Sequence, residues 1–453
     1  MATRILTSSA FAALTIWLGY FAQRDHFWPM FTIYAVFFGL YWAVVFRKKT
    51  HTRTDEKWFI GTGIALRALL LFSLPNFSDD FYRFLWDGHL AAAGVHPFAH
   101  PPVYFVENQC LPASVPAGLF EKLNSPHYFT VYPPVCQAVF WLAAKLAPGS
   151  VWGGIFVLKI FLFACEIATI LTVDGGRLTV DGPPPSAVVR PSSIVLIYAL
   201  NPLAILEIVG NCHFEGAMIF GLVAGLHFLR RKNAGAAALC WAFAVAAKLL
   251  PVLFLPLIVR ELGWKRALRS GLVFAAASLL LWLPLLDGQV LQNMAASLDL
   301  YFQKFEFNAS IYYLLREIGC WLKGYNTGYF IGPMLGFCTV GVVLWLAFGH
   351  RKIEGASRLG TSLDSAMLWA SAIYLFLAST VHSWYITVPL VLAVRARWRF
   401  PVVWSGTAML SYSHYAGGGF RENYGLIALE YALVWGCLAW EIWTFARANR
   451  PAN

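Results

Sequence analysis

The stretch FWPMFTIYAVFFGLYWAVVF, residues 27–46, decides the fold, because it runs for 20 residues without a charged side chain. A helix of about 20 apolar residues matches the thickness of the hydrocarbon core of a bilayer. The basic run RKK at 47–49 follows it directly, which is typical of the cytoplasmic end of a membrane span. This stretch therefore predicts a membrane helix whose C-terminal end lies inside.

Similar apolar stretches recur along the chain. They fall at 5–22, 27–46, 58–75, 151–172, 191–209, 214–229, 234–259, 270–286, 325–348, 365–381, 384–394, 400–415 and 424–446. A full span follows the first stretch at once, so we expect a retained helix there rather than a cleaved signal peptide. With 234–259 crossing twice, the pattern predicts an all-α polytopic membrane protein of about 12–14 transmembrane helices in one domain, 1–453.

Composition excludes several other classes of protein. The chain is 59% hydrophobic and only 13% charged, whereas soluble proteins average about 25% charged residues. With 34 Lys and Arg against 23 Asp and Glu, the net charge is +11, too little for a nucleic-acid partner in so apolar a chain. No Gly-rich phosphate loop or dinucleotide fingerprint is present. The eight cysteines show no disulfide or metal-binding spacing.

The basic residues predict the orientation. With the N-terminus inside, 23 Lys and Arg residues fall in inside loops and seven in outside loops, so both termini are expected in the cytoplasm. Two long segments are then extracytoplasmic: 76–150, with amphipathic helices, and 287–324. Basic clusters flank 234–259 on both sides, which favours a hairpin broken near Lys248–Pro251. This hairpin would lift Lys248 toward the outer face.

The motif SDDFYRFLWDG, 78–88, contains the densest group of polar residues. Ser78 suits the N-cap of a helix that ends near Gly94. We interpret the acid pair Asp79 and Asp80 as a candidate general base at the membrane edge. The alternative is that both acids only cap the helix. Candidates from the same helix to hold a sugar or an anionic ligand are Tyr82, Arg83, Trp86 and Asp87.

Further polar candidates stand at the outer ends of other spans. They are Asn211, His213, Glu215, Lys248, His382, Trp384, Tyr385 and Arg421. Ionisable residues within spans are costly and usually face a functional site. Lys248 is the candidate for a cation facing a phosphate, and an ion pair with Glu207 or Glu215 is the alternative. Interhelical hydrogen bonds and an aromatic belt are the alternatives for the other residues. Because all of them fall on one side, we expect a single outward-facing site.

These motifs carry a resemblance. The quoted helix motif, AAGVHPFAHPP, VYPPVCQ, NPLAILEIVGNCHFEGAM, AAKLLPVLFLPL and HSWY together resemble the bacterial polyprenol-phosphate-sugar-dependent mannosyltransferases of the GT-C superfamily. The first motifs are also similar to the catalytic mannosyltransferase of GPI-anchor synthesis. The resemblance covers roughly 58–400 and implies a GT-C-type bundle with the catalytic acid in a large first outer loop. It adds His96 and Tyr132 to the expected substrate-binding residues.

The resemblance implies a function. We expect an integral-membrane hexosyltransferase of the bacterial inner membrane, facing the periplasm, that moves mannose from a polyprenyl-phosphate donor to a lipid-linked or cell-envelope glycan acceptor. A single inverting displacement with an Asp as base would need no cofactor, and no metal ligands are expected. Asp79 is favoured because it shares a helix face with Tyr82 and Trp86. The alternative is a transporter or flippase of lipid-linked sugars, whose site would lie nearer the midplane.

Overall fold

The protein is described from a computed structural model, over residues 1–47, 51–175, 194–349, 362–396 and 398–448. Regular structure in these ranges consists of helices, and one isolated parallel bridge joins Phe307 to Thr380. The predicted all-α class is confirmed.

The elements of the N-terminal half run in this order: α1 (Ala2–Tyr20), α2 (Phe27–Val45), α3 (Arg53–Leu69), η1 (Leu70–Phe72), α4 (Asp80–Ala92), α5 (Pro102–Glu107), η2 (Phe120–Lys122), α6 (Pro134–Leu146), α7 (Val151–Gly175), α8 (Leu196–Ala199), α9 (Pro202–Ala204), η3 (Ile205–Gly210) and α10 (Glu215–Arg230). The C-terminal half continues with α11 (Ala234–Ala247), η4 (Leu250–Phe254), α12 (Leu255–Leu262), α13 (Trp264–Trp282), η5 (Leu283–Leu285), α14 (Val290–Lys304), α15 (Ile311–Lys323), α16 (Gly328–Leu344), η6 (Trp345–Gly349), α17 (Leu363–Leu377), η7 (Ser383–Ile386), α18 (Thr387–Ala396), α19 (Phe400–Thr407), η8 (Ala408–Tyr415) and α20 (Tyr424–Ala448).

Several helices are suited to cross a bilayer, which confirms the polytopic membrane class. By length and composition five helices in the described ranges qualify, or six when the bent pair around η3 and α10 counts as one span. The five are Phe27–Val45, Val151–Asp174, Trp264–Leu285, Gly328–Gly349 and Tyr424–Arg447. The larger number of about 12–14 spans stays a prediction, because it needs shorter and broken helices such as α11 and α17 to cross as well.

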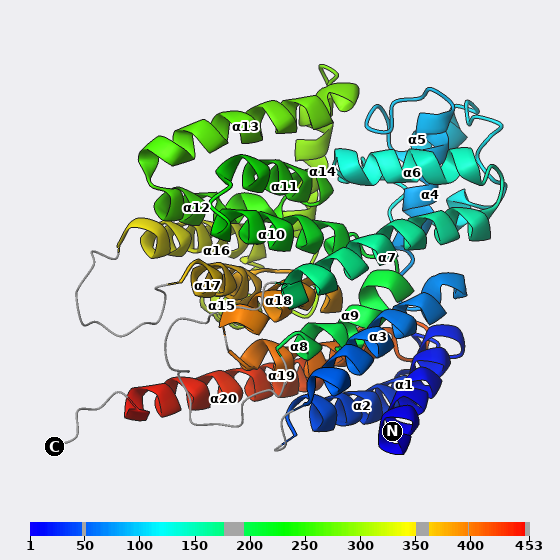
Figure 1. The fold of residues 1–453 in the computed structure, drawn as a ribbon. Coiled ribbons are helices and arrows are strands. Elements are labelled where there is room, and N and C mark those ends of the chain that lie inside the picture. The colour runs from blue at the N-terminus through cyan, green and yellow to red at the C-terminus, as the bar shows by residue number, and fades with distance from the viewer. Residues whose placement is uncertain (48–50, 176–193, 350–361, 397, 449–453) are drawn as a thin grey trace.

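The helices of the predicted outer loop 76–150 gather at one end of the bundle. Figure 1 shows α4, α5 and α6 together in blue and cyan, beside α7. As predicted, α4 ends just before Gly94, which takes a left-handed φ of 79°. The N-cap is Asp79 rather than Ser78, and the Ser78 hydroxyl accepts from the Asp80 backbone N–H at 3.3 Å. The loop therefore places the acid pair at the start of α4.

The predicted break inside 234–259 is present. Helix α11 ends at Ala247, and Lys248 has an extended backbone with φ −155° and ψ 146°. Pro251 stands at the start of the short 3₁₀-helix η4, where its missing N–H costs no helical hydrogen bond. The chain therefore turns at Lys248, so this side chain projects from a helix end.

A buried ion pair ties three helical segments together. Arg67 of α3 donates from Nε to Glu166 of α7 at 2.8 Å, and both side chains are fully buried. Arg67 also donates to the carbonyls of Gly63, Ala199 and, at 3.4 Å, Tyr198. The Tyr198 hydroxyl donates to the other Glu166 oxygen at 2.7 Å. We call Arg67, Glu166 and Tyr198 the Arg67 cluster.

Candidate active site

A sharp elbow in the chain presents the centre of the candidate site. The chain bends by 117° between the helical segments Pro202–Gly210 and Glu215–Arg230. The six residues of η3 form a π-helix, a form that is rare and frequent at functional sites. Cys212, inside the elbow, has a left-handed φ of 63°, a strained conformation for a residue with a side chain. The elbow projects His213 and Glu215, and Glu207 stands on the π-helix just before it.

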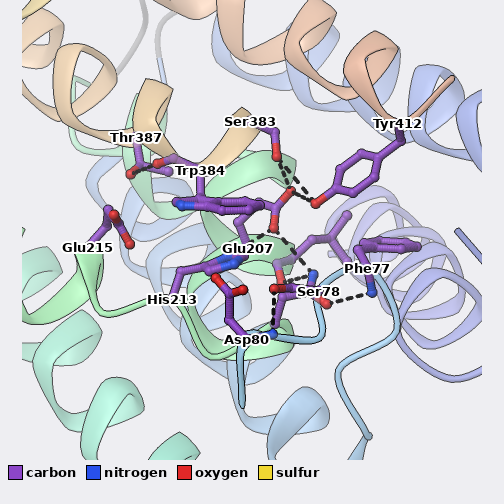
Figure 2. A network of polar contacts seen from close by, with 12 residues as sticks. Phe77, Ser78, Asp80, Glu207, His213, Glu215, Ser383, Trp384, Thr387 and Tyr412 are labelled. Carbon is purple, nitrogen blue, oxygen red and sulfur yellow. Dashed lines mark hydrogen bonds and ion pairs between the residues drawn. The ribbon is translucent and has the colours of Figure 1, made fainter. Parts of the chain in front are cut away.

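Glu207 is the hub of a buried hydrogen-bond network, and its side chain is fully buried. Its Oε1 accepts from the Ser383 hydroxyl at 2.7 Å and from the Tyr412 hydroxyl at 2.8 Å. Its Oε2 lies 3.2 Å from His213 Nδ1. Figure 2 shows Glu207 between these groups, with His213 below it and Ser383 and Tyr412 above. The network joins the elbow to η7 and η8, far along the chain.

Three rings stack beside this network. The rings of His213 and Trp384 are 3.8 Å apart with an interplanar angle of 18°, and those of Trp384 and His382 are 4.3 Å apart at 4°. Both faces of the Trp384 indole are therefore covered by imidazoles. This arrangement leaves no free indole face on which a sugar could stack. The contact of Trp384 with substrate stays a prediction, and in the structure its ring packs between the two histidines.

The two acids of the pair have different surroundings. Asp79 forms an ion pair with Arg24, Oδ2 to Nη2 at 2.6 Å, and the Arg24 guanidinium lies 4.5 Å from the centre of the Tyr415 ring. Asp80 accepts from Asn124 Nδ2 at 2.8 Å through Oδ1. Within the described residues, no hydrogen bond is made to Asp80 Oδ2. In Figure 2 the Asp80 carboxylate stands next to the His213 side chain.

Lys248 and Glu215 form an ion pair in the site. Lys248 Nζ lies 2.9 Å from Glu215 Oε1, and 27% of the lysine side chain is exposed against 3% of the glutamate. The lysine also lies 6.0 Å from the centre of the Tyr132 ring and interacts electrostatically with Asp80. The ion-pair alternative for Lys248 is thus realised, with Glu215. An ammonium has three N–H donors, so Lys248 keeps further donors for a ligand beside the one that meets Glu215.

His382 lies close to several side chains that can carry a positive charge. Burial, together with the nearby charges of His213, Lys248 and His414, holds the pKa of His382 well below its usual range. The Phe307 ring covers it from the side of the segment before α15, with centroids 4.5 Å apart. His382 is therefore a neutral ring at neutral pH, set among side chains that can be positive.

Several buried polar atoms of this cluster have no hydrogen-bond partner in the described structure. They are His213 Nδ1 and Nε2, Glu215 Oε2, His382 Nδ1 and His414 Nε2. Native proteins leave few buried polar groups unsatisfied, and each such group calls for an explanation. Here they converge with Asp80 and Lys248 on one region. Together they offer donors for an anion, acceptors for hydroxyl groups and a carboxylate for a proton.

The helix α4 uses three of its predicted residues for structure instead. Arg83 and Asp87 form a buried ion pair at 2.8 Å, and Arg83 also donates to the carbonyls of Ser125 and Tyr128. Trp86 is fully buried and packs against Phe105 and Phe120. These contacts fold the outer loop, so the structure does not support their predicted contact with ligand.

Other predicted residues also lie outside the cluster. His96 is engaged by the Phe98 backbone N–H and the Leu285 carbonyl. Asn211, by contrast, contacts the cluster: it donates to Glu207 Oε2 at 3.4 Å and accepts from the Phe77 backbone N–H at 3.0 Å, so it holds the segment before the acid pair against the elbow. The ring of Tyr82 faces Lys122, and Arg421 is exposed.

Tyr132 and Tyr385 do lie at the cluster. Tyr132 interacts electrostatically with Asp80 and stands beside Lys248. The Tyr385 ring packs edge-on against His382 at 5.3 Å. Both therefore keep their place among the candidate residues.

The sequence-based site leaves out five residues that complete the arrangement: Arg24, Glu207, Ser383, Tyr412 and His414. Glu207 enters the sequence analysis only as a possible ion-pair partner of Lys248. Single hydroxyls in apolar stretches are common, so Ser383 and Tyr412 are hard to single out from the sequence. In the described ranges no group of three or more His, Cys, Asp and Glu side chains is placed to hold a metal ion. Metal dependence stays untested.

A comparison with known proteins identifies the class. The family model for "Alpha-(1->6)-mannopyranosyltransferase, N-terminal domain" matches residues 5–263, more than half of the chain. The chain belongs to this family of GT-C glycosyltransferases, so it is a membrane-embedded mannosyltransferase. It is similar to alpha-(1->6)-mannopyranosyltransferase A of Mycobacterium tuberculosis, with 24% identity over 394 residues, covering 78% of this chain and 68% of that protein. It is also similar to alpha-(1->6)-mannopyranosyltransferase B of Corynebacterium glutamicum, with 26% identity over 188 residues, 40% of this chain and 29% of that protein.

Proposed function

We propose that the protein transfers mannose from a polyprenyl-phosphate donor to a hydroxyl of a lipid-linked or cell-envelope glycan, at the extracytoplasmic face of the membrane. The observation that supports this proposal is the cluster around Asp80. There a carboxylate with an available oxygen meets Lys248, His213 and unpartnered buried polar atoms. The relatives act in α-(1→6) mannosyl transfer by name, and we extend that linkage to this protein as part of the proposal.

The arrangement suits a single displacement. The acceptor hydroxyl attacks the anomeric carbon, its proton passes to Asp80, and the bond from the anomeric carbon to the phosphate oxygen breaks with its electron pair. The phosphate gains negative charge in this step, so a nearby cation stabilises it as it leaves. Lys248, which interacts electrostatically with Asp80, is such a cation in the site. One displacement inverts the anomeric centre, so a β-linked donor gives an α-linked product.

We assign the base to Asp80 rather than to Asp79. Asp79 was favoured from the sequence because it shares a helix face with Tyr82 and Trp86. Trp86 is in the core of the loop, and Asp79 is paired with Arg24. A general base must reach the proton that it removes, and Asp80 is the acid whose second oxygen is available. Asp79 and Arg24 then fix the start of α4.

The donor class is tested by an exchange of donors. The purified protein is incubated with radiolabelled polyprenyl-phosphate mannose or with GDP-mannose, and with envelope glycolipids from a strain that lacks the gene. We expect label in the glycolipid fraction only from the lipid donor, and release of that label by α-mannosidase. Transfer from GDP-mannose alone would overturn the proposed donor, and a product resistant to α-mannosidase would overturn inversion from a β-linked donor.

The proposed side of the membrane has a separate test. Val106 is 41% exposed in α5, so a V106C change in a background with Cys110 replaced gives a reporter in the outer loop. A membrane-impermeant thiol reagent should label it in cells whose outer membrane alone is permeabilised. Labelling only after lysis contradicts the outward-facing site.

A further inference from the structure

Glu207 is fixed in place beside His213. Its fully buried carboxylate accepts from the Ser383 and Tyr412 hydroxyls at Oε1 and, at 3.4 Å, from Asn211 at Oε2. His213 Nδ1 lies 3.2 Å from Oε2, although neither ring nitrogen of His213 makes a hydrogen bond in the described structure.

The His213 ring is held between Glu207 and Trp384. The Trp384 ring lies nearly parallel to the imidazole, with centroids 3.8 Å apart, and Glu207 Oε2 lies beside Nδ1. An imidazole nitrogen that carries a proton is a hydrogen-bond donor, so Nε2 can donate to a ligand.

The second ring nitrogen of His213 points to a ligand. The side chain is 2% exposed, and Nε2 has no partner in the described structure. A buried polar nitrogen without a hydrogen-bond partner is unfavourable, so Nε2 is suited to meet an oxygen of a ligand. His382 interacts electrostatically with both His213 and Lys248, which places these side chains in one region. An N–H donor close to an ammonium suits an anionic oxygen better than a sugar hydroxyl.

We propose that His213, oriented by Glu207, binds the phosphate of the lipid donor through Nε2–H. Glu207 is a positioning residue that holds the ring through Nδ1, in the manner of other carboxylate–imidazole pairs. This inference rests on the proposed function and adds a phosphate-binding residue to it. The fixed N–H would also stabilise the additional negative charge on the departing phosphate.

The test compares a phosphate with its alcohol. A short-chain polyprenyl phosphate and the matching prenol are titrated into the detergent-solubilised full-length protein. H213N keeps an amide that can donate to Glu207 and removes Nε2, whereas H213Q places its amide near the position of Nε2. We expect H213N to lower phosphate affinity by about 10- to 100-fold and to leave prenol affinity unchanged. H213Q should recover part of the loss.

Two further variants make the test specific. E207Q keeps the shape of the side chain and removes the carboxylate beside His213 Nδ1, so it should also weaken phosphate binding. His227 lies half-buried in the last turn of α10, the helix that follows the elbow, and H227N serves as the matched control that should bind like the unchanged protein. Thermal unfolding of each variant shows that it is folded.

The outcomes separate this inference from the proposed function. If folded H213N keeps the full preference for phosphate over prenol, the His213 assignment is wrong; if H213N does not fold, the same result with E207Q overturns it. A short-chain phosphatidic acid whose binding depends equally on His213 contradicts assignment to the prenyl donor. If the unchanged protein shows no preference for the phosphate, the proposed donor class itself fails. A D80N variant that binds the phosphate normally but does not transfer mannose supports the proposed function whatever His213 does.

Discussion

The Arg67 cluster and the residues around Glu207 are both buried and charged, and they differ in how completely their hydrogen bonds are made. In the Arg67 cluster every charged group meets a partner: the guanidinium has one carboxylate and three carbonyls, and Glu166 also accepts from Tyr198. Around Glu207 the carboxylate is also well bound, but neither ring nitrogen of its neighbour His213 has a hydrogen-bond partner in the described structure. Burial and charge are common to both clusters.

The difference teaches how to separate structural from functional charges inside a membrane protein. In a closed network, where every polar group has a partner, hydrogen bonds and ion pairs offset the cost of removing the charges from water. In an open network, where some polar groups have no partner, a bound ligand supplies the missing contacts. We therefore expect substitutions in the Arg67 cluster to lower stability, and substitutions around Asp80, His213 and Lys248 to lower activity at nearly unchanged stability.

The largest effect is expected at the acid pair. Asp80→Asn keeps the size of the side chain and its contact with Asn124 but cannot accept the proton, so turnover should fall by about 10²- to 10⁴-fold. Asp79→Asn is the matched control, and it should lose much less because only its pairing with Arg24 is weakened. The measurement is the initial rate of mannose transfer, with thermal unfolding as the check on folding.

The opposite ranking would return the base to Asp79, as the sequence favoured. If both single variants and the double variant remain active on the true acceptor, an Asp base at this position is wrong. In that case the unpartnered polar groups around Glu207 would not mark an active site.

The next effect is expected in the closed cluster. Removing one member of a buried ion pair leaves the other charge without a partner and costs about 3–5 kcal/mol. Arg67→Met should therefore lower the unfolding temperature of the purified protein strongly. Arg67→Met combined with Glu166→Leu should recover part of the loss, since no lone charge remains. An Arg67→Met protein of normal stability that has lost transfer would place this cluster in the functional class.

The fold class and part of the site could be predicted from the sequence, because hydropathy and charge act over long stretches. The break at Lys248 followed from basic residues on both sides of one apolar run, and the structure has its helix end there. The position of Asp80 at the start of a helix followed from the Ser78–Gly94 pattern to within one residue.

The partners inside the site could not be predicted in the same way. Glu207 meets Ser383 and Tyr412 across 176 and 205 residues of sequence, and no local pattern encodes such a contact. Trp86 and Arg83 share a helix face with the acids, yet the surrounding loop takes them into its own core. Helical spacing shows which residues share a face but not which neighbour that face meets.

A smaller effect is expected at Lys248. Its ammonium is paired with Glu215, but 27% of the lysine side chain is exposed. Lys248→Met should therefore affect stability less than Arg67→Met does. A hydrogen bond to a charged group contributes about 1.5–3 kcal/mol, which corresponds to a rise of about 10- to 100-fold in KM for the lipid donor. Lys145, which donates to the Ala92 carbonyl in the outer loop, gives the control K145M. Unchanged donor kinetics in Lys248→Met would make the lysine purely structural.

The smallest effect is expected at His89, which is buried in α4 without being part of either cluster. Burial lowers the pKa of this imidazole below its usual value. An unfolded chain binds a proton at His89 near pH 6.5, whereas the folded protein does so only at lower pH. Stability from this group is therefore intact above about pH 6.5 and decreases as the pH falls through the window between the two pKa values. His89→Gln should make the unfolding temperature less sensitive to acid, while the exposed His127→Gln should not. If the two variants respond to acid alike, burial of the His89 imidazole has no measurable cost in stability.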